Sequence, residues 1–229
     1  MGYNYIENIL PKNNDKRPQI KMEAKTLTIH STGNPDSTAQ GERAWLSNSD
    51  NDRVASYHLV VGEEDVIKIL PFNEVGWHAG DGRNGEGNTT SIGLEIVESG
   101  DRYKVLINAI NYIADLLYEK EWNISDLKKH EDWSGKNCPR ILIDPNHIKK
   151  HNGEKMDWGW FLEKISERLD NKIKSEIPEW KKKGIEYLVE NDLMNDKNLW
   201  NKRINEKMEV WAITLILKRI HEDLKKGGK

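Results

Sequence analysis

Short apolar segments, bounded by Gly, Pro, Asn and Asp, alternate with amphipathic segments along the first part of the chain. Four segments are short and rich in β-branched residues, so we expect strands at 26–31, 55–61, 65–70 and 91–97. Residues 102–119 instead carry apolar side chains at three- and four-residue steps, which predicts a helix with one buried face. Shorter helices are expected at 36–47, from Asp144-Pro145 onward, and at 155–169. This alternation predicts an α/β domain with a central mixed sheet flanked by helices.

A second unit is expected to begin near Ile177-Pro178, where the pattern becomes purely helical. Helical spacing recurs at 179–191, 196–204 and 208–225, and these segments predict a small three-helix domain. Such a domain is marginal in buried area, and Trp180, Trp200 and Trp211 are candidates for its core. The expected domains are therefore residues 1–170 and 177–229.

Composition narrows the classes of function. The 229 residues are 36% hydrophobic and 32% charged, and no apolar run approaches the ~20 residues of a membrane span. The N-terminus lacks an apolar signal-peptide region, so we expect synthesis in the cytoplasm without a signal peptide. A net charge of −3 argues against a nucleic-acid binder, and the single Cys excludes an internal disulfide. The oligomeric state is not indicated.

Two histidines and the only thiol are candidates for one metal site. His30 ends a strand-like run and is followed by Ser-Thr-Gly, while His130 and Cys138 lie across a turn rich in Gly, Asn and Pro. Catalytic zinc sites keep three protein ligands and one open position, whereas structural sites close with a fourth ligand. Spacing alone leaves two interpretations open: a metal site, or a buried Cys beside two unrelated histidines.

The Gly-rich stretch 72–90 has no helical or strand periodicity. Loops of this length in a compact domain are usually functional or disordered, and the aromatic residue and the His inside this one favour function. The stretch lacks the Lys-Ser/Thr that a phosphate-binding loop requires, so it does not indicate a nucleotide site.

Four stretches of the chain together resemble a known family. They are TIHST around His30, SYHLVV around Tyr57, GWHAGDGRN…NTTSIGLEI over 76–96, and HEDWSGKNCPR from His130. Their order and content resemble the zinc-dependent N-acetylmuramoyl-L-alanine amidases of the amidase-2 and peptidoglycan-recognition-protein superfamily, especially phage endolysins and related autolysins. The resemblance covers about residues 20–165.

The resemblance implies a catalytic Zn²⁺ held by His30, His130 and Cys138. Cys rather than Asp in the third position is similar to the endolysin and recognition-protein branch. The implied reaction is hydrolysis of the amide between N-acetylmuramic acid and L-alanine in bacterial peptidoglycan, with the enzyme acting on the cell wall after release. A zinc ion would lower the pKa of its water from ~15.7 to roughly 7.

Three further residues match positions that carry catalysis in the family. Glu95 is a carboxylate inside an apolar strand, which is costly unless it has a role or a partner, and the resemblance makes it the general base. Lys136, two residues before Cys138, would stabilise the oxyanion of the tetrahedral intermediate. Tyr57 stands where some members use a catalytic Tyr, but with Glu95 also present it could instead orient water or substrate.

The loop from Gly76 to Thr90 is expected to form one wall of the substrate-binding site, with Trp77, His78 and Asn88 as candidate substrate contacts. The helical second unit weakly resembles cell-wall-anchoring modules, which would hold the enzyme on its substrate. A dimerising or stabilising appendage is the alternative for this unit.

Two other hypotheses apply to the whole protein. A non-catalytic peptidoglycan receptor could use the same scaffold, but such receptors typically lose the Cys ligand that this chain retains. A structural zinc protein would use the same three residues to hold loops together, and it would unfold on chelation.

Overall fold

A computed structural model describes residues 2–176, 179–191, 214, 217, 218, 220–222 and 225 of the chain. The chain divides into two compact units, Met1–Lys172 and Ile173–Lys229.

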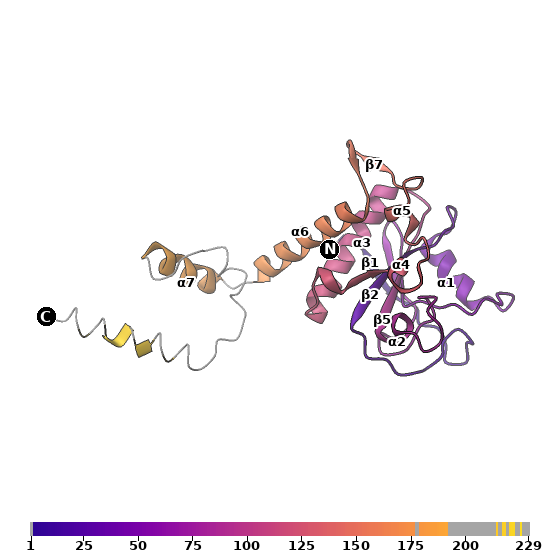
Figure 1. Ribbon diagram of the computed structural model, residues 1–229, viewed down its shortest axis with the longest axis horizontal. Coiled ribbons are helices and arrows are strands. Elements are labelled where there is room, and N and C mark those ends of the chain that lie inside the picture. The colour runs from indigo at the N-terminus through magenta and orange to yellow at the C-terminus, as the bar shows by residue number, and fades with distance from the viewer. Residues whose placement is uncertain are drawn as a thin grey trace. The chain divides into compact units, whose positions relative to one another are not determined.

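The first unit is built on a six-stranded sheet (Figure 1). The strands are β1 (Asn4–Glu7), β2 (Thr26–Ser31), β3 (Leu59–Val61), β4 (Asp65–Lys68), β5 (Ser91–Ile96) and β6 (Leu127–Lys129), in the spatial order β1-β4-β3-β5-β2-β6. Every neighbouring pair is parallel except β3–β4, which is antiparallel. The expected mixed α/β sheet is therefore confirmed.

The two faces of the central strands differ in polarity. Successive side chains of a strand point to opposite faces, so Leu27 and Ile29 lie on one face of β2 and Thr28 and His30 on the other. The parallel register aligns His30 with Glu95 of β5, which therefore shares the polar face. The polar face can carry a site while the apolar face belongs to the core.

Helix α3 (Arg102–Lys120) packs against β3, β4 and β5 (Figure 1). Asp101 caps its N-terminus by accepting hydrogen bonds from the backbone N–H groups of Tyr103 and Lys104, which would otherwise lack partners. Helix α6 (Trp158–Glu176) is tied to α3 by an ion pair between Lys172 Nζ and Asp115 Oδ1 at 2.9 Å. These two helices are the long expected ones, although α6 begins and ends later than the pattern predicts.

Shorter helices surround the polar face. They are α1 (Ala39–Ser47), α2 (Glu86–Thr90), α4 (His130–Ser134) and α5 (Arg140–Ile143), with a 3₁₀ turn η1 (Ile124–Asp126) before β6. Helix α4 is held over β2 by a 2.8 Å hydrogen bond from Trp133 Nε1 to Thr28 Oγ1. The polar face of β2 therefore lies beneath α4.

The prediction of a helix that begins at Asp144-Pro145 is wrong. Asp144 instead ends α5, where its backbone N–H donates to the carbonyl of Arg140 at 2.9 Å. Its carboxylate accepts from the backbone N–H of Asn146, which makes a turn rather than a helix start. A hairpin that the sequence pattern does not predict follows, formed by β7 (Lys150–His151) and β8 (Glu154–Lys155). Its Asn152-Gly153 turn has positive φ at both residues, 48° and 87°, as a type I′ turn requires.

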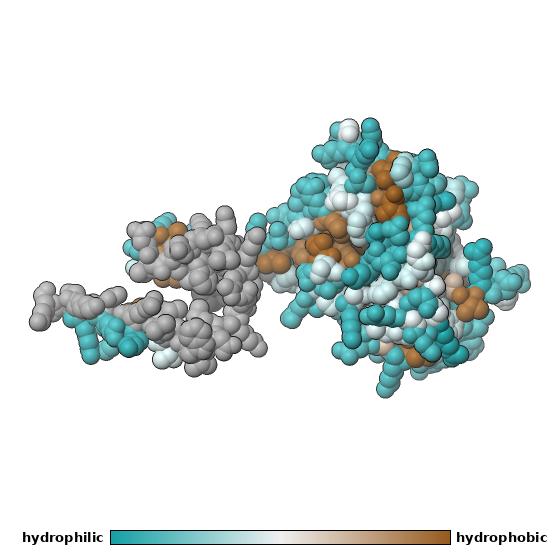
Figure 2. Space-filling model, in the orientation of Figure 1, coloured by the Kyte–Doolittle hydropathy of each residue, from teal (hydrophilic) through white to brown (hydrophobic). Residues whose placement is uncertain are grey.

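In the second unit, α7 (Glu179–Glu190) agrees with the predicted helix at 179–191, and Ile185 is buried. The helix expected at 196–204 lies outside the described residues, as does most of the one expected at 208–225. Among the described residues, no helix is long and apolar enough to cross a bilayer. The face of the first unit seen in Figure 2 is mainly hydrophilic, with separate small hydrophobic areas.

Candidate metal centre and cleft

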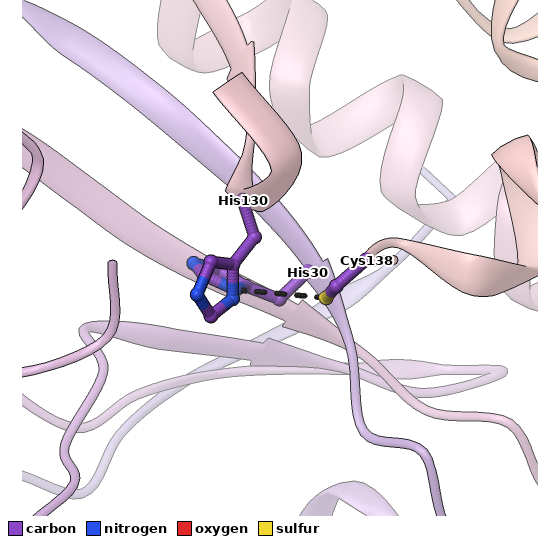
Figure 3. Close-up of side chains that lie close together, drawn as sticks. All are labelled: His30, His130 and Cys138. Atoms are coloured by element: carbon purple, nitrogen blue, oxygen red, sulfur yellow. Dashed lines mark hydrogen bonds between the residues drawn. The ribbon is translucent and has the colours of Figure 1, made fainter. Parts of the chain in front are cut away.

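His30, His130 and Cys138 converge on one point above the polar face of the sheet (Figure 3). His30 lies near the end of β2, His130 opens α4, and Cys138 lies in the loop before α5. Nδ1 of His30 lies 2.9 Å from Nδ1 of His130 and 3.8 Å from Sγ of Cys138, and one ligand atom from each of the three residues lies within 4.8 Å of the others. All three residues are buried.

The loop between His130 and Cys138 is folded back by its own backbone. Gly135 ends α4 in the left-handed conformation, with φ of 72°, which a residue with a side chain rarely adopts. The backbone N–H of Glu131 then donates to the carbonyl of Cys138 at 3.1 Å and closes the loop. The backbone N–H of Ser31 reaches Cys138 Sγ at 3.4 Å. The loop thereby returns the thiol to the end of β2.

The electrostatics of the three residues suit metal binding. Burial lowers the pKa of His130 to about 4 and, aided by the neighbouring histidines, lowers that of His30 well below its usual value. Both imidazoles are therefore neutral at pH 7 and carry lone pairs. Burial also raises the pKa of the Cys138 thiol to about 12, so a bound cation has to displace its proton. Two imidazoles and a thiolate are ligands that zinc accepts, so the group is compatible with a metal site.

Glu95 is the acidic group beside this cluster. Burial and then the negative charge of Glu42 raise its pKa, Lys136 opposes both effects, and the resulting pKa is about 8. Oε2 of Glu95 is buried with no hydrogen-bond partner among the described residues. A carboxyl in a cleft with one buried, unpartnered oxygen and a pKa near neutrality is typical of functional sites.

A cleft of about 700 Å³ opens over the cluster. Its lining includes Trp45, Tyr57, Trp77, Glu95, His130 and Lys136. Lys136 is exposed, whereas Tyr57 is buried in the wall. The cleft therefore joins the metal-compatible group, a carboxyl and an ammonium in one solvent-accessible volume.

Tyr57 is held by a residue that the sequence analysis did not single out. Its hydroxyl donates to Oε2 of Glu42 at 2.6 Å, and burial, followed by the charges of Glu42 and Glu95, raises the pKa of this phenol well above its usual value. Tyr57 is therefore a neutral phenol with its proton directed at Glu42. The only sequence signal for Glu42 is its place in the first turn of α1.

His78 and Asn88, the other two candidate substrate contacts, form hydrogen bonds within the first unit. Both are buried, and His78 directs Nδ1 to Nε2 of His30 and Nε2 to the carbonyl of Ser91, each at 3.0 Å. Oδ1 of Asn88 accepts from the backbone N–H groups of His78 and Ala79, at 2.7 and 2.9 Å. These contacts hold the Gly-rich loop against the sheet. Trp77 and His78 both line the cleft.

The loop that carries Cys138 is anchored by an ion pair that sequence reasoning also missed. Arg140 donates through Nε and Nη2 to the carboxylate of Glu98, whose side chain is 4% exposed. Glu98 lies just beyond β5, so the pair joins the loop to the central sheet.

Comparison with known proteins gives consistent matches for the first unit. Residues 20–141 match the family described as N-acetylmuramoyl-L-alanine amidase. The chain is 44% identical over 133 residues to the N-acetylmuramoyl-L-alanine amidase CwlA of Bacillus subtilis (strain 168), covering 56% of this chain and 48% of that protein. It is 40% identical over 148 residues to the amidase XlyA of the same strain, covering 62% and 48%. The chain thus matches about half the length of these relatives.

Solved structures agree with the sequence matches. The catalytic domain of XlyA is 36% identical, covers 71% of this chain and 99% of that one, and superimposes with a TM-score of 0.61. PlyL is 27% identical, covers 72% and 98%, and has a TM-score of 0.61. The matched part corresponds in extent to the whole of each solved chain.

Proposed function

The chain belongs to the N-acetylmuramoyl-L-alanine amidase family, and on this premise we propose that it hydrolyses the amide between N-acetylmuramic acid and L-alanine in bacterial peptidoglycan. The observation that supports this most is the convergence of His30, His130 and Cys138 beside Glu95 in an open cleft. The activities named for CwlA and XlyA support the same reaction.

We propose Zn²⁺ as the metal, with Nδ1 of His30, His130 and Sγ of Cys138 as its ligands. The fit rests on the donor set, because imidazole nitrogen and thiolate are preferred zinc ligands and three of them leave a position open. When bound, zinc supplies Lewis-acid chemistry that polarises the scissile carbonyl and lowers the pKa of water.

Glu95 acts as the general base and then as the general acid. Its pKa of about 8 lies near neutrality, where a carboxyl can both accept a proton from the attacking water and return it to the leaving amine of L-alanine. Its free buried oxygen, Oε2, is the atom proposed to hold that proton.

Lys136 and Tyr57 act on the substrate carbonyl and its surroundings. The exposed ammonium of Lys136 lines the cleft, so it can approach the carbonyl oxygen and stabilise the negative charge that develops there. The hydroxyl proton of Tyr57 is directed at Glu42. We therefore assign Tyr57 to orienting water or substrate rather than to proton transfer. Trp77 is the proposed apolar contact for the sugar–peptide junction.

The helical second unit is proposed to bind the cell wall. A tether of this kind raises the local concentration of substrate without a new catalytic contact. Together with the family, this supports a lytic enzyme of the endolysin or autolysin type that acts on peptidoglycan from outside the cytoplasm.

The decisive experiment is to follow the new ends released from purified peptidoglycan by the intact protein, a chelated sample and a sample reconstituted with zinc. New L-alanine amino termini that vanish on chelation and return with zinc are expected. New reducing ends would indicate a glycosidase and overturn the proposal. Wall binding without any product would make the chain a receptor.

A further inference from the structure

A chain of hydrogen bonds leads from the backbone of β5 through His78 to His30 of the proposed metal group. The carbonyl of Ser91 contacts Nε2 of His78 at 3.0 Å, and Nδ1 of His78 contacts Nε2 of His30 at 3.0 Å. The remaining nitrogen, Nδ1 of His30, is the atom that faces His130 and Cys138.

The chemistry of these atoms determines where each proton sits. A backbone carbonyl only accepts, so Nε2 of His78 carries a proton and donates it to Ser91. A neutral imidazole with a proton on Nε2 has a lone pair on Nδ1, so His78 accepts from the Nε2–H of His30. His30 is then left with a bare Nδ1, the form that can bind a metal. The opposite tautomer of His30 would direct a proton into the metal position.

The surroundings of His78 are built for this arrangement. A Cβ placed on Gly93 would lie 2.6 Å from Cγ of His78, so only glycine at this strand position admits the ring. Asn88 Oδ1 accepts hydrogen bonds from the backbone N–H groups of His78 and Ala79, while Asn88 Nδ2 donates to the carbonyl of Gly82 at 3.0 Å. Hydrogen bonds to both the ring and the backbone N–H of His78 thus hold this residue in place.

We propose that His78 is a positioning residue that selects the Nε2–H tautomer of His30 and so presents Nδ1 to the metal. This inference rests on the proposed function for the identity of the metal. It assigns His78 and Asn88 to the support of the metal centre rather than to substrate contact. Partners of metal-bound histidines commonly change metal affinity ~10–100-fold when they are removed.

The test compares His78→Leu with His78→Asn in the full chain. Leu and Asn have nearly the same shape, but only Asn offers an oxygen near the position of Nδ1 to accept from His30. Zinc affinity, measured by competition with a chromophoric chelator, should fall ~10–100-fold in His78→Leu and recover to within a few-fold of wild type in His78→Asn. Thermal unfolding of both chelated variants controls for loss of fold.

A second measurement does not depend on any variant. Long-range ¹H–¹⁵N NMR correlations of the imidazole rings in the zinc-loaded wild-type protein should show His30 protonated at Nε2 and ligated through Nδ1. Ligation through Nε2, or equal zinc affinity in His78→Leu and wild type, would overturn the role of His78. Both readouts are independent of turnover, so an inactive protein that binds zinc would contradict the proposed reaction while leaving this inference standing. Failure of the wild type to bind zinc would overturn the metal centre and the inference together.

Discussion

Glu98 and Arg140 form a forked ion pair immediately behind the Cys138 loop. Nε of Arg140 lies 2.9 Å from Oε1 of Glu98, and Nη2 lies 2.6 Å from Oε2. Oε1 also accepts from the backbone N–H of Gly33, in the turn after β2. One buried carboxylate therefore ties together the two segments that carry His30 and Cys138.

Removing the cation from this pair should destabilise the first unit. Arg140→Ala leaves the carboxylate of Glu98 buried with fewer partners, at a cost of roughly 2–4 kcal/mol in the free energy of unfolding. Urea denaturation at pH 7 measures this change in the free energy of unfolding. Lys164→Ala is the matched control, because it breaks the more exposed Lys164–Glu167 pair of α6 and should cost less than ~1 kcal/mol. Equal losses in the two variants would contradict the anchoring role.

The same pair makes stability depend on pH. Burial alone would raise the pKa of Glu98, but the hydrogen bonds and charge of Arg140, together with hydrogen bonds from Ser31 and Gly33, outweigh burial and hold the pKa below its usual range. A depressed pKa stabilises the fold above the unfolded-state value, and this contribution is lost as pH falls through the folded-state value. Unfolding free energy should therefore decrease below about pH 4 in the wild type, with a smaller decrease in Arg140→Ala.

The sequence pattern identified the central elements because their periodicity is strong. The apolar run of β5 and the repeating apolar face of α3 appear where they were expected. Strands β1 and β6 were not predicted, because they are short edge strands whose side chains are mostly exposed or half-buried. They therefore lack a clear alternation of apolar and polar residues. The Asp144-Pro145 pair was misleading because the same residues that start helices also make turns.

The candidate site was predictable only in part. His30, His130 and Cys138 were identified from residue type, spacing and the family resemblance, and the structure brings them together. The roles of His78 and Glu42 depend on partners distant in the chain, His30 for the first and Tyr57 for the second. A sequence shows which donors and acceptors exist, but only the fold shows which of them are already paired.

Glu95→Gln should abolish most turnover while retaining zinc. The amide keeps the shape of the carboxyl but cannot accept the proton of the attacking water, so kcat/KM should fall ~10²–10⁴-fold. The control is Glu64→Gln, an exposed position outside the cleft, which should behave as wild type. Near-normal turnover in Glu95→Gln would remove this residue from the mechanism.

Glu42→Gln should move the acid limb of the pH–rate profile. The charge of Glu42 raises the pKa of Glu95, so its removal lowers that pKa and lets Glu95 ionise at lower pH. Activity should therefore persist to more acidic pH than in the wild type. Tyr57→Phe is the paired variant, because it removes the 2.6 Å hydrogen bond but keeps the Glu42 carboxylate. A downward shift in Tyr57→Phe as large as that in Glu42→Gln would contradict the electrostatic explanation.

Chelation should inactivate the enzyme without unfolding it. The core of the first unit lies between the apolar face of the sheet and α3, away from the three ligand residues, so most of the fold does not depend on the metal. Circular dichroism should change little after chelation, while Tm should fall only by the amount that loss of a bound ligand produces. Cys138→Ser should resemble the chelated protein and should not regain activity with zinc. Global unfolding on chelation would instead support the structural-zinc hypothesis.

Removal of the second unit should separate catalysis from wall binding. A chain ending at Glu176 retains the whole of α6 and all the residues of the proposed active site. It should remain folded and cleave soluble muropeptide with unchanged kcat/KM, because the described residues that line the cleft all lie at or before Lys136. Co-sedimentation with purified walls should weaken by ~10-fold or more, since the tether is lost. Sedimentation velocity on both chains tests the alternative role: equal wall binding with loss of a dimer on truncation would make the second unit an assembly module instead.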